Sequence, residues 1–155
     1  DVSLSRWTPR ATSTQAGAAI SQLVIDPIEW RDLAQDIAAA GGRLLALWGT
    51  SRVGQSDTLH AVAVAPPRVL LISFPIADGN RQYPGVEDVF PSASRMQRAV
   101  FDLCGLRSTD HDARPWLRHA AWPEDAFPLA ANPMPSSPQS ESNSQGGASA
   151  QPRPA

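Results

Sequence analysis

Apolar residues recur three and four positions apart shortly after residue 26, which is the spacing of one face of an α-helix. The residues of this stripe are Trp30, Leu33, Ala34, Ile37 and Ala38. Asp26 precedes the stripe as an N-cap, Pro27 takes the first helical position, and Glu29 follows three residues after the cap. Gly41-Gly42 is typical of a helix end, because glycine accepts a left-handed conformation at little cost. The pattern predicts a helix over residues 27–40.

Three short apolar segments follow this helix, at residues 43–48, 58–65 and 68–74. A polar stretch with two glycines separates the first two segments. Pro66-Pro67 separates the last two, because proline cannot donate a hydrogen bond to a neighbouring strand. Short connections favour antiparallel pairing of successive strands. We therefore predict an α+β fold, with a helix followed by a three- to four-stranded, mainly antiparallel sheet.

Segments on either side of these strands are less distinctive. Residues 21–25 form a short apolar run that predicts either a strand or the lead into a helix. Residues 86–90 are compatible with a fourth short strand. Residues 1–20 are rich in Ser, Thr and Ala and contain Pro9 and Gly17, so we predict an irregular N-terminal segment.

A second helix is expected to begin after Pro91, with Ser92 or Ser94 as its N-cap, and to end at Gly105. Its apolar residues at helical spacing predict an inward stripe made by Met96, Ala99, Val100 and Leu103. Arg98 and Asp102 are four positions apart, so we expect them to pair on the helix surface.

The remaining sequence divides into two parts. Residues 106–129 are predicted to be irregular, because their prolines prevent a long helix. Residues 130–155 have five prolines, no aromatic residue and two charged residues, so ordering them would bury little apolar surface. We expect a disordered tail or linker there, an irregular segment over 1–20, and a single domain over 21–129.

Composition excludes several classes of protein. The formal net charge is −2, whereas a nucleic-acid binder needs enough basic residues to neutralise phosphates. One cysteine excludes an internal disulfide and a cysteine-rich zinc or iron–sulfur site in this chain. No apolar run approaches the roughly 20 residues of a membrane helix, and no secretory signal is evident, so a cytoplasmic location is expected.

Two kinds of chemical site have weak support in the sequence. Cys104 with His111 and Asp112 contains the residue types of a nucleophilic triad, which leaves a small hydrolase as one alternative. Cys104 also lies beside the predicted inward stripe, where an inert buried thiol is usual. His60, His111 and His119 lack the spacing of known metal motifs. We therefore expect no catalytic, cofactor or metal site in this chain.

Arginine and tryptophan concentrate between residues 98 and 122, and both residue types are enriched at the anchors of protein interfaces. The candidate interface residues are Arg98, Asp102, Arg107, His111, Asp112, Arg114, Trp116, Arg118 and Trp122. The alternative is that the two tryptophans of this region fold back to cover the sheet.

The same region carries a family resemblance. The run YPGVEDVFPSASRMQRAVFDLCGL, then HDAR, then WPEDAFPL, resembles the 30 kDa subunit family of respiratory NADH:quinone oxidoreductase (complex I) over residues 22–129. It is most similar to the related N-terminal domain of the large subunit of group 4 membrane-bound [NiFe] hydrogenases, as in formate hydrogenlyase. Arg98, Asp102 and Gly105 match the family's signature helix, whereas Gln97 and Ala99 stand where the family has acids.

The resemblance implies a non-catalytic structural and docking subunit of an electron-transfer complex. It implies packing against the large subunit and a neighbouring iron–sulfur subunit, with no cofactor in this chain and with iron–sulfur, Ni–Fe or flavin centres only in partner subunits. It implies a cytoplasmic position at the inner face of the cell membrane, reached only through partners. The alternatives are an N-terminal module of a fused hydrogenase large subunit whose catalytic domain lies outside this chain, and a free adaptor domain.

Overall fold

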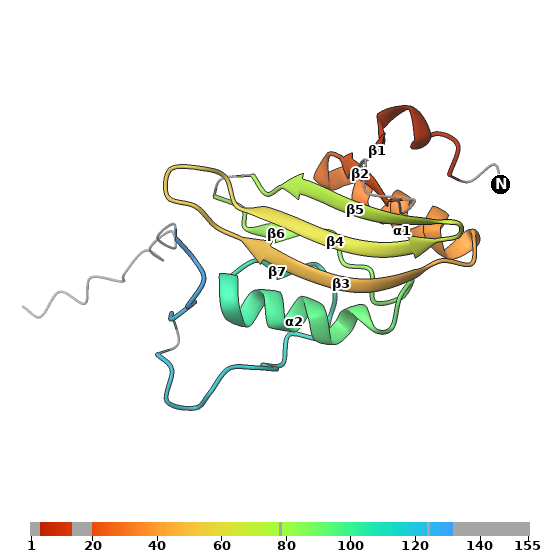
Figure 1. Ribbon diagram of the computed structural model, residues 1–155. Coiled ribbons are helices and arrows are strands. Elements are labelled where there is room, and N and C mark those ends of the chain that lie inside the picture. Colours follow the sequence, from red (N-terminus) through yellow and green to blue (C-terminus); the bar gives the residue numbers. More distant parts are fainter. Residues whose placement is uncertain (1–3, 14–19, 78, 124, 132–155) are drawn as a thin grey trace, which may run out of the picture.

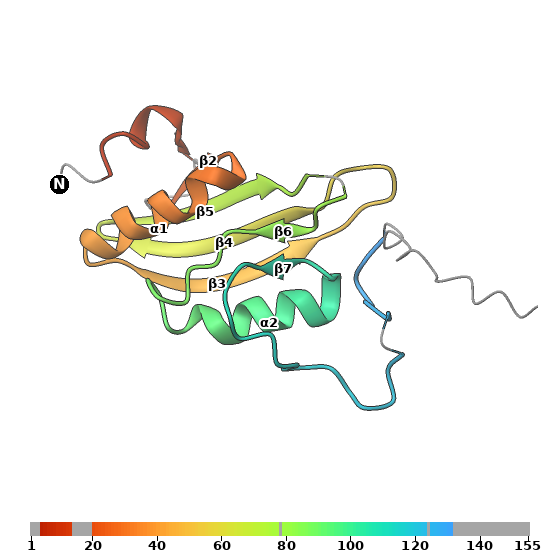
Figure 2. The ribbon, with the colours of Figure 1, turned by 180° about the vertical axis from the view of Figure 1, so that it is seen from behind.

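In the computed structural model, two helices lie on one side of a five-stranded sheet (Figures 1 and 2). The structure describes residues 4–13, 20–77, 79–123 and 125–131. The predicted tail or linker therefore lies outside the described residues, except for Ala130 and Ala131. The α+β class predicted from the sequence is confirmed.

The strand order across the sheet is β1-β2-β5-β4-β3. The bounds are β1 Thr12–Ser13, β2 Ile20–Val24, β3 Arg43–Thr50, β4 Thr58–Ala65 and β5 Arg68–Pro75. The predicted meander is confirmed, because β4 pairs antiparallel with both β3 and β5. The segment left open as strand or helix is β2, and it runs parallel to β5. A helix after β2 carries the chain across the sheet to β3 at the far edge, so β2 and β5 meet without a hairpin.

The helix predicted over 27–40 is confirmed, with a 3-10 turn η2 (Pro27–Glu29) leading into α1 (Trp30–Ala39). Glu29 Oε2 accepts a hydrogen bond from the Asp26 backbone N–H at 2.9 Å, which is one half of a capping box. After the helix, Gly41 adopts a φ of 73°, in the left-handed region where glycine is favoured.

The main core lies between α1 and the sheet. Alternate residues of β4, Leu59, Ala61 and Ala63, are completely buried on the side that faces α1. The small alanines leave room for Trp30, which is also completely buried and whose ring centroid lies 5.6 Å from that of Phe74 on β5. A buried tryptophan contributes a large apolar surface, so this contact anchors α1 to the sheet.

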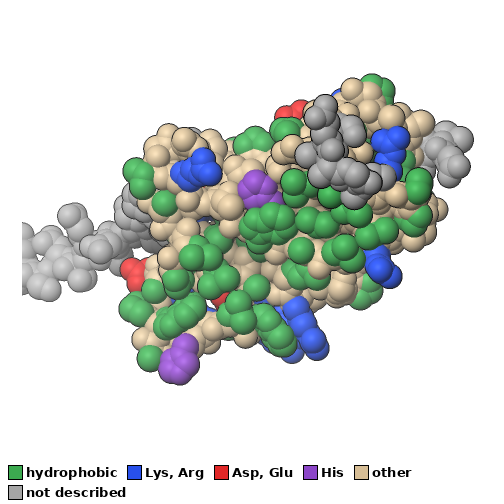
Figure 3. Space-filling view, viewed as in Figure 1, with side chains coloured by type: hydrophobic (Ala, Val, Ile, Leu, Met, Phe, Trp, Pro, Cys, Tyr) green, Lys and Arg blue, Asp and Glu red, His purple; other side chains and the backbone are tan. Residues whose placement is uncertain are grey.

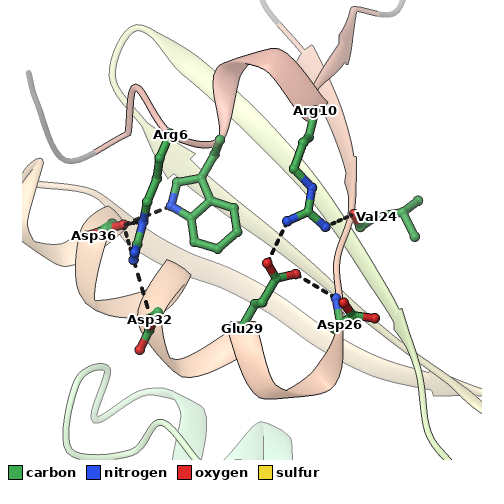
Figure 4. A network of polar contacts seen from close by, with 8 residues as sticks. Arg6, Arg10, Val24, Asp26, Glu29, Asp32 and Asp36 are labelled. Atoms are coloured by element: carbon green, nitrogen blue, oxygen red, sulfur yellow. Dashed lines mark hydrogen bonds and ion pairs between the residues drawn. The ribbon is translucent and has the colours of Figure 1, made fainter.

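The N-terminal segment is more ordered than the sequence predicted. Residues 8–10 form a 3-10 turn, η1 (Thr8–Arg10), and β1 follows, so the irregular assignment is wrong for residues 8–13. Trp7 is 6% exposed, and its indole N–H donates to Asp36 on α1 at 2.8 Å (Figure 4). Arg10 pairs with Glu29 at 2.6 Å, so side chains of this segment hold it against α1.

The fourth strand predicted at residues 86–90 is wrong, because this segment is a turn in which Phe90 N–H donates to Val86 O at 2.8 Å. The Val86 N–H donates to the Gln97 side chain at 3.0 Å, so a side chain takes the place of a strand partner. A different short strand, β6 (Gln82–Tyr83), pairs in parallel with β7 (Arg107–Ser108). These two strands connect the turn region to the segment after the second helix.

The second helix, α2 (Ala93–Cys104), packs beside β3 and ends at Gly105, whose φ is 72°. The prediction of its inward stripe is only partly right. Val100 is buried, whereas Met96, Ala99 and Leu103 are half-buried. The buried positions of α2 include Ala93, Gln97, Val100 and Cys104. The core-facing side therefore includes a polar residue, Gln97, whose side chain accepts a hydrogen bond from the turn before the helix.

Candidate functional site

Asp102 organises the segment that follows α2. Its side chain is 1% exposed, and its Oδ2 accepts backbone N–H bonds from Trp116 at 2.7 Å, Leu117 at 2.6 Å and Arg118 at 3.2 Å. The predicted surface pair of Arg98 with Asp102 is therefore wrong. Three N–H groups that converge on one carboxylate give charge-assisted bonds, which are stronger than an exposed ion pair on a helix.

Trp116 rests on α2 between two guanidinium groups. The Arg95 guanidinium lies 4.9 Å from the indole centroid and the Arg98 guanidinium lies 5.2 Å from it. Arg98 also pairs with Asp112, with Nε 3.6 Å from Oδ2. The indole stays 46% exposed, so Trp116 lies against α2 and does not fold back over the sheet.

The next two residues extend this surface. Leu117 is 46% exposed, which is high for a large apolar side chain held by hydrogen bonds at its own backbone. The Arg118 Nη2 donates to Pro123 O at 3.0 Å and to Ala126 O at 3.2 Å, and the guanidinium lies over the Phe127 ring. Arg118 therefore fixes the loop that returns after the tryptophan.

Half-buried Asp112 and exposed Arg114 form a two-bond pair beside Trp116. The Arg114 Nε and Nη2 donate to the two carboxylate oxygens at 2.9 and 2.8 Å. The Arg114 hydrogen bond holds the pKa of Asp112 well below its usual range. His111, immediately before this pair, is exposed.

A partly buried polar cluster connects α2 to the turn at residues 84–87. Asp110 Oδ2 accepts a hydrogen bond from Gln97 Nε2 at 2.6 Å and from Glu87 N–H at 3.0 Å. A Cβ on Gly85 would fall on the Asp110 carboxyl group, so glycine is required there for space. Gln97 thus donates a hydrogen bond to the Asp110 side chain. A deprotonated acid at position 97 has no N–H to donate and would repel the Asp110 carboxylate.

An ion pair with little exposure lies at the other end of α2. The Arg81 Nη2 is 3.2 Å from Asp57 Oδ2 and donates to Cys104 O at 2.6 Å. Arg81 O accepts the Arg107 N–H at 2.8 Å. Sequence reasoning did not single out Asp57 or Arg81, because nothing in their spacing brings residues 57 and 81 together.

The other chemical candidates do not form sites among the described residues. Cys104 is 2% exposed, burial raises the pKa of its thiol, and its Sγ lies 3.7 Å from Gly49 O. His111 is exposed, and no hydrogen bond joins it to Cys104 in the described part of the chain. No three His, Cys, Asp or Glu side chains in this part are grouped so that they could hold a metal ion.

The structure gathers most of the predicted interface residues around Trp116, and the exceptions are informative. Those around Trp116 are Arg98, Asp112, Arg114, Trp116 and Arg118, with Asp102 beneath them. Asp102 is 1% exposed, so its prediction as a residue that itself contacts a partner is wrong, and His111 is exposed outside this group. Arg107 instead stacks over Phe101, and Trp122 is half-buried in the next turn. Sequence reasoning missed Arg95 and Leu117. The signals were the three-residue spacing of Arg95 from Arg98 and a lone leucine among arginines.

Comparisons with known proteins bear on this fold. The family model described as "Respiratory-chain NADH dehydrogenase, 30 Kd subunit" matches residues 23–136. A trypsin-resistant Nqo5 fragment is similar in structure, with a TM-score of 0.56 and 16% identity, over 67% of this chain and 89% of that one. A chain of an archaeal respiratory membrane complex, the membrane-bound sulfane sulfur reductase, gives a TM-score of 0.64 and 15% identity, over 77% and 75%. No curated protein sequence matches the chain.

Proposed function

This chain belongs to the respiratory-chain NADH dehydrogenase 30 kDa subunit family, and from that membership we propose that it is a docking subunit that packs against the large subunit of its complex. Membership makes it a subunit of a complex I-like or membrane-bound hydrogenase-like assembly. In the described residues, no helix is both long enough and apolar enough to cross a membrane. We propose that the chain reaches the inner face of the membrane through its partners.

The observation that carries the docking proposal is the exposed pair of Trp116 and Leu117, which we call the Trp–Leu pair. Each side chain is 46% exposed, yet the backbone of both residues is fixed by hydrogen bonds to buried Asp102. A rigid, exposed aromatic anchor loses little conformational entropy when a partner covers it. This makes the pair suited to fill a pocket on another subunit.

Arginines give the same surface a charge preference. Arg95 and Arg98 lie against Trp116, and Arg114 has a side chain that is 81% exposed. Guanidinium groups around an apolar centre favour a partner that brings carboxylates to the rim. We propose a pocket on the large subunit that is apolar at its centre and acidic at its edge. We also propose that the redox centres belong to that subunit and to an iron–sulfur neighbour.

A co-purification experiment tests the proposal. The chain is produced with an affinity tag in its own cells, as the wild type and as the Leu117→Glu and Trp116→Ala variants. The complex of each is extracted from membranes and purified through the tag. We expect recovery of a large, cysteine-bearing subunit to fall about tenfold or more, as for an interface hot spot. Ile28→Glu is the matched control, because Ile28 is 82% exposed and lies before α1, outside this surface. Unchanged recovery with both Trp–Leu variants would refute the docking role of this pair.

A further inference from the structure

The sheet face opposite α1 and α2 is not covered by any helix of the described chain (Figures 1 and 2). Its side chains come from the outward positions of β3, β4 and β5, and the register arranges them in rows. Val62 lies between Ala46 and Leu71 in one row, and Val64 lies beside Val69 in the next. Figure 3 shows the resulting band of hydrophobic side chains. We call this surface the open sheet face.

The apolar band extends onto β2, where Ile20 lies beside Val69 and Val24, which is 62% exposed, lies beside Ser73. Gln22 on β2 lies beside Leu71, and Thr12 on β1 lies beside Gln22. Gln22 interrupts the band only in its middle row, so the apolar rows run over β3, β4 and β5 and reach β2 at both ends. One α-helix with its side chains is about 10–12 Å wide, whereas a second sheet would cover a wider apolar face. The part of the band on β3, β4 and β5 spans about 10 Å between the outer strand axes, which is the width that one helix covers.

Trp48 is the aromatic anchor of the open sheet face. Its ring stacks on His60, with centroids 5.3 Å apart, and it remains 37% exposed. Both nitrogens of the His60 ring are hydrogen-bonded, Nε2 to Thr50 Oγ1 at 2.8 Å and Nδ1 to Ser73 Oγ at 2.9 Å. The histidine is therefore fixed, and it presents the indole in one orientation, which lowers the entropy cost of covering it.

The charges at the ends of the band select the kind of partner. Arg43 lies opposite Val64 at one end, and Arg52 lines a hollow with Trp48 and His60 at the other. No Asp or Glu occupies an outward strand position among the described residues. Two copies packed face to face would bring arginine against arginine, so a second copy is disfavoured. Carboxylates near both ends of a partner would complement these arginines.

We infer that the open sheet face receives an amphipathic helix from a neighbouring subunit, with an apolar stripe and with carboxylates near both ends of that stripe. Each of the three strands has eight residues and is about 26 Å long, so the helix has about 17 residues. This inference rests on the proposed function, since the neighbour is another subunit of the same complex. The face is separate from the Trp–Leu pair and provides a second contact.

Site-specific photo-crosslinking in the native complex tests this inference. Benzoylphenylalanine replaces Trp48, Leu117 or Ile28 in turn, and the tagged complex is irradiated in the cells that produce it. Far-UV circular dichroism of each purified variant checks that the fold is retained. Mass spectrometry then identifies the crosslinked peptide. We expect the probe at position 48 to join a helical segment of another subunit that is apolar on one side and acidic near both ends, and the probe at 28 to give no adduct.

The outcomes separate this inference from the proposed function. An adduct at 117 without one at 48 overturns the helix on the open sheet face and leaves the docking role intact. Absence of an adduct at 117 counts against the docking role. An adduct between two copies of this chain at 48, or with a segment that is not helical or not acidic, also overturns the inference.

A charge reversal adds a check that does not depend on the probe's reactivity. The double variant Arg43→Glu and Arg52→Glu places acids at both ends of the band. We expect it to lower the adduct yield at position 48 roughly tenfold, because like charges then face each other. Arg43→Lys with Arg52→Lys keeps the charge and should retain most of the yield. Equal yields for the two double variants would overturn the assignment of acidic ends to the helix.

Discussion

Replacing Asp102 by asparagine tests how the Trp–Leu pair is held. The side chain keeps its shape and one acceptor oxygen, but the three backbone bonds from residues 116–118 lose their charge assistance. Bonds to a charged group contribute about twice as much as neutral ones, so three weakened bonds cost about 2–4 kcal/mol, less some solvation of the freed N–H groups. We expect a net loss of about 2 kcal/mol in the free energy of unfolding.

Urea unfolding at pH 7 measures this loss, and amide hydrogen exchange locates it. A slope of about 1–3 kcal/mol/M converts 2 kcal/mol into a midpoint shift of roughly 1 M. The amides of Trp116 and Leu117 should exchange faster, while those of β4 should change only by the global loss. Asp32→Asn is the control, because Asp32 pairs with Arg6 at 3.9 Å with both side chains more than half exposed, and it should barely move the midpoint. An Asp102→Asn midpoint equal to the wild-type value, with unchanged exchange at 116 and 117, would show that the Asp102 charge does not hold the Trp–Leu pair.

Three further perturbations test other parts of the fold. Asp57→Ala leaves the Arg81 guanidinium with little exposure and without its carboxylate, so the free energy of unfolding should fall by about 3–5 kcal/mol in the same urea assay. Burial lowers the pKa of His60, so the folded chain binds fewer protons than the unfolded chain. Wild type should lose stability relative to His60→Gln as pH falls below about 6.5, and a flat difference between pH 8 and 5 would contradict this. The Cys104 thiol should react with dithiobis-nitrobenzoate only on unfolding, because burial protects it and raises its pKa. Rapid labelling of the folded chain would contradict this and revive the hydrolase alternative.

The sequence was informative where structure depends on local periodicity. The helix at 27–40 and the antiparallel strands β3, β4 and β5 follow from spacing, caps and prolines within each segment, and all are confirmed. The choice of an α+β class needed only these elements.

Long-range contacts explain what the sequence missed. β2 was left open between strand and helix, because its partner residues on β5 lie 49 positions further along the chain, as in the pair Ile20 and Val69. The order of residues 8–13 depends on Trp7 meeting Asp36, which no local pattern indicates.

The candidate site shows the same limit at the level of single side chains. The four-residue spacing of Arg98 and Asp102 suggested an ion pair, but Asp102 binds backbone N–H groups 14–16 residues later. Side chains leave a signal in sequence patterns, whereas a backbone donor does not. Gln97 was noticed as a departure from the family, and its partner Asp110 became evident only in the fold.

Native mass spectrometry of the tagged chain, extracted gently from its own membranes, shows whether the chain is held in a complex by a large subunit. We expect a complex in which one copy of this chain is bound to a large, cysteine-bearing subunit, with iron–sulfur, Ni–Fe or flavin mass carried by the partners. A chain recovered alone at its own mass, or one that carries flavin or metal and turns over substrate without partners, would rule out a non-catalytic docking subunit.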